Sequence, residues 1–125
     1  MRVSIHQPNF VPWYPFFQKI KEVDVFVILK ECQFEKNGYQ NRFNFNDKWY
    51  TMSVKKGLES MRDKVYIDPK NNWDKIKNSL PKYKSILNEM DKCIVENLTT
   101  TNFCIISNFC EMLDIDTELK VDQPT

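Results

Sequence analysis

Glycine is scarce in this sequence, and its scarcity excludes the common phosphate-binding loops. The 125 residues contain only two glycines, Gly38 and Gly57, which lie nineteen positions apart. A Walker loop needs glycines five apart and a dinucleotide fingerprint needs three within six residues, because only glycine lets backbone amides approach phosphate closely. The sequence therefore encodes neither class of nucleotide loop.

Histidine is scarcer still, which limits the metal chemistry open to the chain. His6 is the single histidine, and the cysteines show no CxxC pair, so an ordinary zinc set cannot be assembled. A set made of His6, Asp24 and Glu31 is also disfavoured, because Asp24 begins its predicted strand at the opposite end. We expect no metal site.

Long apolar runs and an excess of either charge are absent as well. No apolar stretch reaches about 18 residues, and the opening "MRVSIHQPNF" lacks the apolar centre of a signal peptide. We expect a cytoplasmic protein without a transmembrane segment, in which all four cysteines stay reduced and form no disulfide: Cys32, Cys93, Cys104 and Cys110. The net charge of +1 gives no global field for nucleic acid or an anionic membrane.

The first third of the chain predicts a parallel βαβ unit. Residues 3–6 form a short β-branched strand, and residues 13–23 carry an apolar stripe at helical spacing. The run "DVFVIL" at 24–29 is typical of a strand buried on both faces. We expect the two strands to be parallel neighbours joined by the helix.

The rest of the chain predicts a hairpin followed by helices. Alternating residues at 39–54 flank a polar turn at Asn46-Asp47-Lys48, which is typical of an antiparallel hairpin. The other predicted elements are a strand at 64–67, helices at 72–79, 81–96 and 101–113, and the start of a strand in "TELKVDQPT". The fold class is therefore α/β, a small sheet starting with a parallel βαβ unit, an antiparallel hairpin and a helical C-terminal half, in a single domain over residues 1–125.

Polar residues follow both strands of the βαβ unit, where ligands bind in open α/β sheets. His6 and Gln7 end the first strand, and Glu31, Cys32 and Gln33 follow the second. We expect His6, Gln7, Gln33 and Arg42 to lie around one cleft at the carboxyl ends of these two strands. A histidine can exchange a proton near neutral pH, while Gln7 and Asn9 could orient a polar substrate. The alternative is a structural histidine that bonds the loop backbone. Cys32 is a weaker candidate, as a nucleophile.

The hairpin carries a second polar set. Gln40, Arg42 and Asn44 alternate in "YQNRFNF", so they share one strand face, and Arg42 can grip a carboxylate or phosphate. A solvent-facing hairpin side explains the same pattern equally well. A basic group further along is either a phosphate-attracting rim or a solvated surface: Lys55, Lys56, Arg62 and Lys64.

Four motifs in order, "VSIHQPNFVPW", "KIKEVDVFVIL", "QFEKNGYQNR" and "WYTMSVKK", resemble the N-terminal half of the WbqC-like protein family. The match covers residues 2–56 strongly and 100–125 more weakly. Members normally continue further, so we expect this chain to be truncated. The family-like polar positions are His6, Gln7, Pro8, Asn9, Gln33, Phe34, Gln40, Asn41 and Arg42. Lys30 stands where the family often has an acid, and Pro15 replaces a common glycine.

The resemblance implies a role in bacterial O-antigen or other surface-polysaccharide (lipopolysaccharide) biosynthesis, as a transferase that attaches glycine or another acyl group to a sugar. Our first hypothesis is a transferase acting on a nucleotide-linked amino sugar, with His6 as general base and Arg42 or Lys55 holding phosphate. The substrate contacts would come from Gln7, Asn9, Gln33, Gln40, Asn41, Arg42 and Lys55. The acyl donor, any cofactor and the oligomeric state stay unassigned.

Two other hypotheses remain. One is a non-catalytic module that binds a sugar nucleotide or a partner enzyme through the same edge. The other is a nucleotidyltransferase-like fold, which also opens with a strand, a histidine-bearing loop and a helix, but which has a second histidine and a glycine that this sequence lacks.

Overall fold

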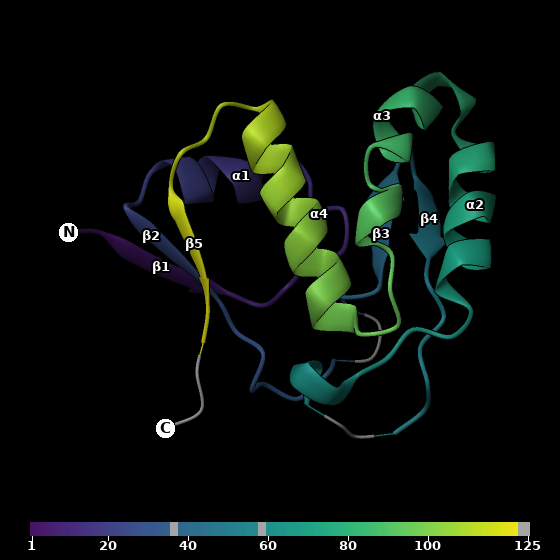
Figure 1. Cartoon of the computed structure of the whole chain (residues 1–125), viewed down its shortest axis with the longest axis horizontal. Helices are drawn as coiled ribbons and strands as arrows, with labels where there is room; N and C mark the ends of the chain where they lie inside the picture. The colour runs from purple at the N-terminus through teal and green to yellow at the C-terminus, as the bar shows by residue number, and fades with distance from the viewer. Residues whose placement is uncertain (36–37, 58–59, 123–125) are drawn as a thin grey trace.

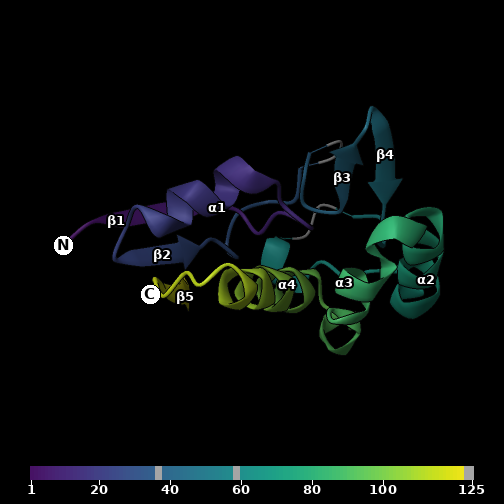
Figure 2. The ribbon, with the colours of Figure 1, turned by 90° about the horizontal axis from the view of Figure 1, so that it is seen from above.

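The computed structural model describes residues 1–35, 38–57 and 60–122, and it confirms the mixed α/β class. The strands are β1 (Val3–His6), β2 (Val25–Ile28), β3 (Arg42–Phe45), β4 (Lys48–Thr51) and β5 (Glu118–Val121). The α-helices are α1 (Tyr14–Lys21), α2 (Pro69–Ser79), α3 (Lys84–Asn88) and α4 (Leu98–Met112). Figures 1 and 2 show β1, β2 and β5 at one end, the β3–β4 hairpin and α2 at the other, and α4 between them.

The parallel βαβ unit is confirmed. β1 and β2 are parallel neighbours, α1 connects them, and β5 adds a third parallel strand on the other side of β2. The helix begins after Trp13, and Pro15 falls in its first turn, where a missing backbone N–H costs nothing. The predicted C-terminal strand is β5, while residues 123–125 of that segment lie outside the described part of the chain.

Within the described ranges, helices cover one face of this sheet and leave the other open, so the prediction that β2 is buried on both faces is wrong. Phe26 and Ile28 are fully buried against α1 and α4, whereas Val25 and Val27 on the other face are half-buried. Neighbouring residues of β1 on that second face, Val3 and Ile5, are 53% and 56% exposed. The cause is topological: successive crossovers of one hand that advance in one direction place both helices on the same side.

The predicted antiparallel hairpin is confirmed, although Lys48 belongs to β4 and not to the turn. β3 and β4 pair antiparallel from Arg42 opposite Thr51 to Phe45 opposite Lys48. Asn46 and Asp47 form the turn with φ of 52° and 62°, the left-handed conformation that a two-residue hairpin turn requires and that these residue types tolerate.

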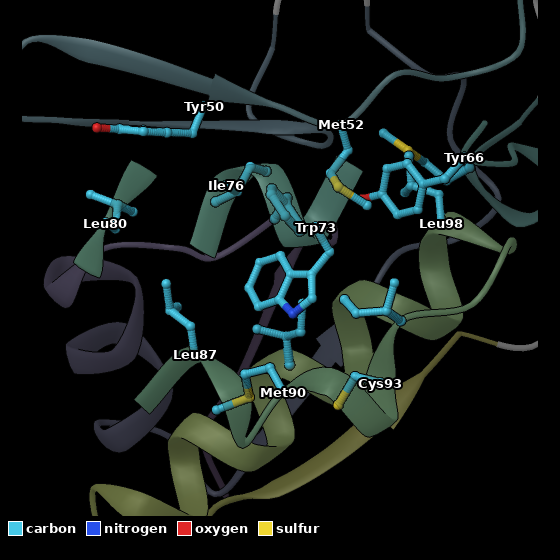
Figure 3. Close-up of a cluster of buried hydrophobic side chains, with 14 residues drawn as sticks. Tyr50, Met52, Tyr66, Trp73, Ile76, Leu80, Leu87, Met90, Cys93 and Leu98 are labelled. Carbon is cyan, nitrogen blue, oxygen red and sulfur yellow. The ribbon is translucent and has the colours of Figure 1, made fainter. Parts of the chain in front are cut away.

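The second core lies between the hairpin, α2, α3 and α4. The Trp73 indole sits among its buried side chains in Figure 3, and its Nε1 donates to Asp91 Oδ1 over 2.9 Å. α4 joins the two cores, because Ile105 packs into this cluster while Ile106 packs against the sheet.

The predicted helix over 81–96 is wrong as a single element. The segment contains two short 3-10 turns, at Pro81–Tyr83 and Asp91–Cys93, on either side of the five-residue α3. Asp91 accepts hydrogen bonds from Trp73 and Lys77 of α2, which turns the chain back toward that helix. Tertiary bonding to α2 therefore overrides local helix propensity here.

The predicted strand at 64–67 is also absent among the described residues. Val65 and Tyr66 make only isolated bridges, to Asn97 and Val54 respectively, so each finds a different partner on a different side. Asp68 then takes a left-handed φ of 45° and Pro69 begins α2, which leaves no length for a ladder.

The prediction of four free thiols is wrong for one pair. Cys93 and Cys104 form a disulfide, while Cys32 and Cys110 are free. The 3-10 turn at Asp91–Cys93 packs against α4, which brings the two Cα atoms to 5.3 Å, a separation that a disulfide spans. Sequence spacing alone gave no sign of this pairing.

No α-helix in the described part of the chain is both long and apolar enough to cross a lipid bilayer.

Candidate functional site

A cavity of about 720 Å³ lies between the loop that follows β1 and the hairpin. Three short segments form its wall: the β1 loop, the segment before the hairpin, and the hairpin itself. Its lining residues are His6, Gln7, Asn9, Phe10, Val11, Pro12, Trp13, Glu35, Gly38, Tyr39, Gln40, Phe43, Asn44 and Trp49.

His6 ends β1 on the covered face of the sheet. Its ring meets the Phe16 ring edge-on, with centroids 4.8 Å apart, and its Nδ1 lies 2.9 Å from the Gln7 carbonyl oxygen. A carbonyl oxygen only accepts, so Nδ1 carries the proton and donates. In the neutral imidazole Nε2 is then the unprotonated nitrogen.

The surroundings of His6 favour this neutral form. Burial lowers the pKa of the imidazole, the hydrogen bond to Gln7 raises it, and the nearby positive charge of Lys19 lowers it, with a net pKa below the ordinary 6.5. At neutral pH the site therefore holds an imidazole whose Nε2 can accept a proton.

Two glutamines and one glutamate form a chain of hydrogen bonds in the wall. Gln40 Nε2 donates to Gln7 Oε1 over 2.7 Å, and Gln7 Nε2 donates to Glu35 Oε1 over 3.2 Å. Gln40 is buried, and its Oε1 has no hydrogen-bond partner among the residues that the structure describes. A methyl group on Gly38 would meet that oxygen, so any other residue at position 38 would require the Gln40 side chain to shift.

Large aromatic rings line the cavity without being buried in it. Trp13, Tyr39 and Trp49 are 74%, 55% and 42% exposed, and the Tyr39 and Trp49 rings lie 5.8 Å apart. The Arg42 guanidinium stacks 3.9 Å from the centre of the Trp49 ring and donates through Nε to the Gly38 carbonyl. Arg42 thus holds the hairpin wall of the cavity in place.

Asn102 of α4 links the loop after β1 to the segment before the hairpin through hydrogen bonds. Its buried Nδ2 lies 2.7 Å from both the Pro8 and the Gln40 carbonyl oxygens, and its Oδ1 accepts from the Tyr66 hydroxyl over 2.6 Å. Complete burial raises the pKa of Tyr66 well above its usual 10, so its hydroxyl stays a donor. One helix side chain therefore positions both the histidine loop and the segment before the hairpin.

Val11 in the same wall has a left-handed backbone, with φ of 43°. This conformation is unfavourable for a β-branched residue by about 1–2 kcal/mol, so the surrounding packing has to hold it.

Metal ligation finds no support in the described ranges: no three side chains of His, Cys, Asp or Glu gather closely enough there to hold an ion.

The sequence profile of the WbqC-like protein family matches residues 7–124 of the 125. The chain belongs to this family. No curated protein and no solved structure matches it.

Several WbqC-like motif residues meet in the cavity and others do not. His6, Gln7, Asn9 and Gln40 line it. Asn41 instead donates to the Met52 carbonyl behind the hairpin. Three further residues lie outside the cavity lining: Gln33, which bridges to Ser60, Lys55, which is exposed, and Arg42, which stands behind Trp49.

In this WbqC-like chain the residues that follow β1 and those that follow β2 therefore lie at two different cavities. A second one, of about 420 Å³, lies beyond β2 and β5 and is lined in part by Lys30 and Arg62. Glu31 faces this side, because its carboxylate pairs with Arg62 at 3.3 Å. The expectation that one cleft would hold the residues after both strands fails for this reason.

Sequence reasoning missed four residues of the site: Glu35, Tyr39, Trp49 and Asn102. Glu35 and Tyr39 lie within the family-like motif "QFEKNGYQNR", so their place between Gln33 and Gln40 was a usable signal. Asn102 had none, because an asparagine within a helix is ordinary until the structure shows what it bonds.

Proposed function

We propose that this WbqC-like protein is a transferase of bacterial surface-polysaccharide (O-antigen) biosynthesis that attaches glycine or another acyl group to a nucleotide-linked amino sugar. The observation that carries the proposal is the His6 imidazole, which lines the cavity with Nδ1 bound to the Gln7 carbonyl and Nε2 left as the basic nitrogen. The resemblance to the WbqC-like family supports the choice of pathway, and the cavity chemistry supports the class of reaction.

A sugar ring fits the composition of the cavity wall. The exposed faces of Trp13, Tyr39 and Trp49 can pack against the C–H groups of a pyranose, while Asn9 and Asn44 offer amides to hydroxyls. An apolar body with a few convergent polar groups is the usual make-up of a small-molecule site.

The transfer step uses His6 as general base. The sugar amine attacks the carbonyl carbon of an activated acyl thioester, a new C–N bond forms, and the C–S bond breaks with its electron pair going to sulfur. Nε2 of His6 takes the proton released from nitrogen and returns it to the leaving thiolate. The neutral state of the imidazole at neutral pH makes it ready for this step.

His6→Asn tests the proposal. The protein is incubated with a UDP-linked amino sugar and a panel of activated acyl thioesters that includes the glycyl thioester, and acylated sugar is detected by mass spectrometry. We expect turnover to fall by about 10²–10⁴-fold in the variant, the usual contribution of a general base, while binding of the UDP-sugar survives. Lys19→Gln, which changes a charge near His6 without removing the imidazole, is the matched control and should retain turnover.

The same assay tests the second candidate, a non-catalytic sugar-nucleotide module. The half-buried packing of His6 against Phe16 favours that candidate, because it also suits a purely structural ring. Wild-type protein that binds the UDP-sugar but forms no acylated product with any thioester would favour the module and overturn the transferase.

A further inference from the structure

Glu35 brings a negative charge to the cavity that the transfer chemistry above does not use. It is the one carboxylate among the described residues of the lining, and it is joined to Gln7 by the 3.2 Å hydrogen bond. The described lining contains no lysine or arginine. Glu35 is therefore the charged side chain of the described lining, while the guanidinium of Arg42 lies behind the Trp49 ring.

Glu35 also sets the direction of the hydrogen-bond chain. A carboxylate only accepts, so Gln7 must turn its Nε2 toward Glu35 and its Oε1 toward Gln40. Gln40 must then donate through Nε2, and its Oε1 becomes the acceptor at the end of the chain. Turning either amide over would place two acceptors against each other, so the orientation of both amides follows from the carboxylate.

The result is a wall rich in hydrogen-bond acceptors. Nε2 of His6 and the carboxylate of Glu35 both accept hydrogen bonds, and both residues line the cavity. The faces of Trp13 and Tyr39 attract positive charge through their ring quadrupoles. Acceptors, a carboxylate and exposed indole and phenol rings together suit a ligand that presents N–H donors and a positive charge.

We propose that Glu35 is a substrate-binding residue that selects a sugar carrying a free, protonated amino group over its N-acylated form. This inference rests on the proposed function, since it names the residue that recognises the acceptor amine in the same cavity. The bound ammonium releases one proton to solvent, and the neutral amine then attacks the acyl carbon. The preference for the ammonium group also favours release of the product. The amide has neither the positive charge nor the full set of N–H donors of the ammonium group that Glu35 binds, so the acylated sugar binds more weakly than the substrate.

Titration of the free monosaccharides tests this without any choice of nucleotide or acyl donor. Glucosamine and N-acetylglucosamine are added separately, at neutral pH, to isotopically labelled protein, and the tryptophan indole signals are followed by NMR. We expect wild-type protein to bind glucosamine at least about tenfold more tightly, as a charge-assisted hydrogen bond provides. Glu35→Gln should remove this preference and leave the affinity for N-acetylglucosamine unchanged.

Glu31→Gln is the matched control, because Glu31 lies four positions earlier and pairs with Arg62 outside the cavity. It should keep the wild-type preference. The inference is overturned if wild-type protein shows no preference for the amine, if it binds neither sugar, or if Glu35→Gln retains the preference.

The two proposals fail separately. If Glu35→Gln keeps the preference while His6→Asn loses turnover, the transferase stands and Glu35 has no part in recognition. If the preference depends on Glu35 but turnover does not depend on His6, recognition of the amine stands and the catalytic role of the histidine falls.

Discussion

His6 is the single histidine of the chain, so its imidazole C–H signals in an NMR titration belong to one residue. We expect a pKa below the ordinary 6.5 in the folded protein, because burial and Lys19 both disfavour the charged ring. In concentrated urea the same signals should titrate at about 6.5. Lys19→Gln should move the folded value upward, and a folded value above 6.5 would contradict the packing described for this ring.

The same shift makes stability depend on pH. Below about 6.5 the unfolded chain takes up a proton that the folded chain resists, so the contribution of His6 to stability is present above 6.5 and is lost as pH falls through the folded pKa. His6→Asn should abolish this part of the dependence in urea unfolding measured from neutral to mildly acidic pH.

At Val11 we expect a glycine variant to be more stable than an alanine variant, the reverse of the usual order within a helix. Its φ of 43° is open to glycine but strained for any residue with a Cβ, so Val11→Gly should be more stable than Val11→Ala by about 1 kcal/mol. At the exposed Lys75 in α2 the order should reverse, with glycine less stable than alanine by about 1 kcal/mol. Chemical denaturation of the four variants measures both differences, and alanine winning at both positions would refute the left-handed backbone at Val11.

At the scale of the element, α4 connects the sheet, the second core and the cavity. Asn102 makes the connection to the cavity. Its side-chain amide donates hydrogen bonds to the Pro8 and Gln40 carbonyls and accepts one from the Tyr66 hydroxyl. Removing it takes the donor from the buried Pro8 carbonyl and leaves the Gln40 carbonyl with the Tyr66 hydroxyl alone. A buried oxygen left unpaired costs about 1–3 kcal/mol.

Asn102→Ala should therefore lower the free energy of unfolding by about 2–4 kcal/mol and, in NMR spectra, shift the backbone signals of the loop after β1. Asn78→Ala, an exposed asparagine of α2, should change stability by less than about 0.5 kcal/mol. Equal effects at both positions would mean that Asn102 does not fasten the cavity walls.

At the scale of the whole molecule, the single covered face of the parallel sheet can be measured. Phe26 and Val25 are neighbours in β2, but Phe26 packs between α1 and α4 while Val25 lies on the open face. We expect Phe26→Ala to destabilise by about 3–5 kcal/mol and Val25→Ala by about 1 kcal/mol or less. A similar large loss for both variants would show that something also covers the second face.

The sequence predicted the elements whose signals are local. The βαβ unit followed from an apolar stripe and an apolar run, and the hairpin followed from Asn46 and Asp47, which tolerate the turn that their φ values show. The histidine loop was identified because it follows a strand end, and it does line the cavity.

The misses depend on contacts between distant segments. The residues around Asp91 do not indicate that Trp73 and Lys77 will donate hydrogen bonds to it and that the helix will end there. The residues around Cys93 do not indicate its disulfide with Cys104. Glu35 was passed over because its role comes from Gln7, 28 positions earlier. Periodicity describes one segment at a time, so pairings of this kind lie beyond it.

The order of strands in the sheet also determines when, during translation, β2 can pair with each of its neighbours. β2 is the central strand, and Val25 pairs with Val3, 22 positions before it, and with Glu118, 93 positions after it. At translation rates of about 5–20 residues per second, β5 leaves the ribosome roughly 5–20 s after β2. During that interval one edge of the most apolar strand in the chain has no partner of its own, and every neighbouring nascent chain carries the same open edge. The period of greatest risk for this protein is thus the interval before its last strand is synthesised.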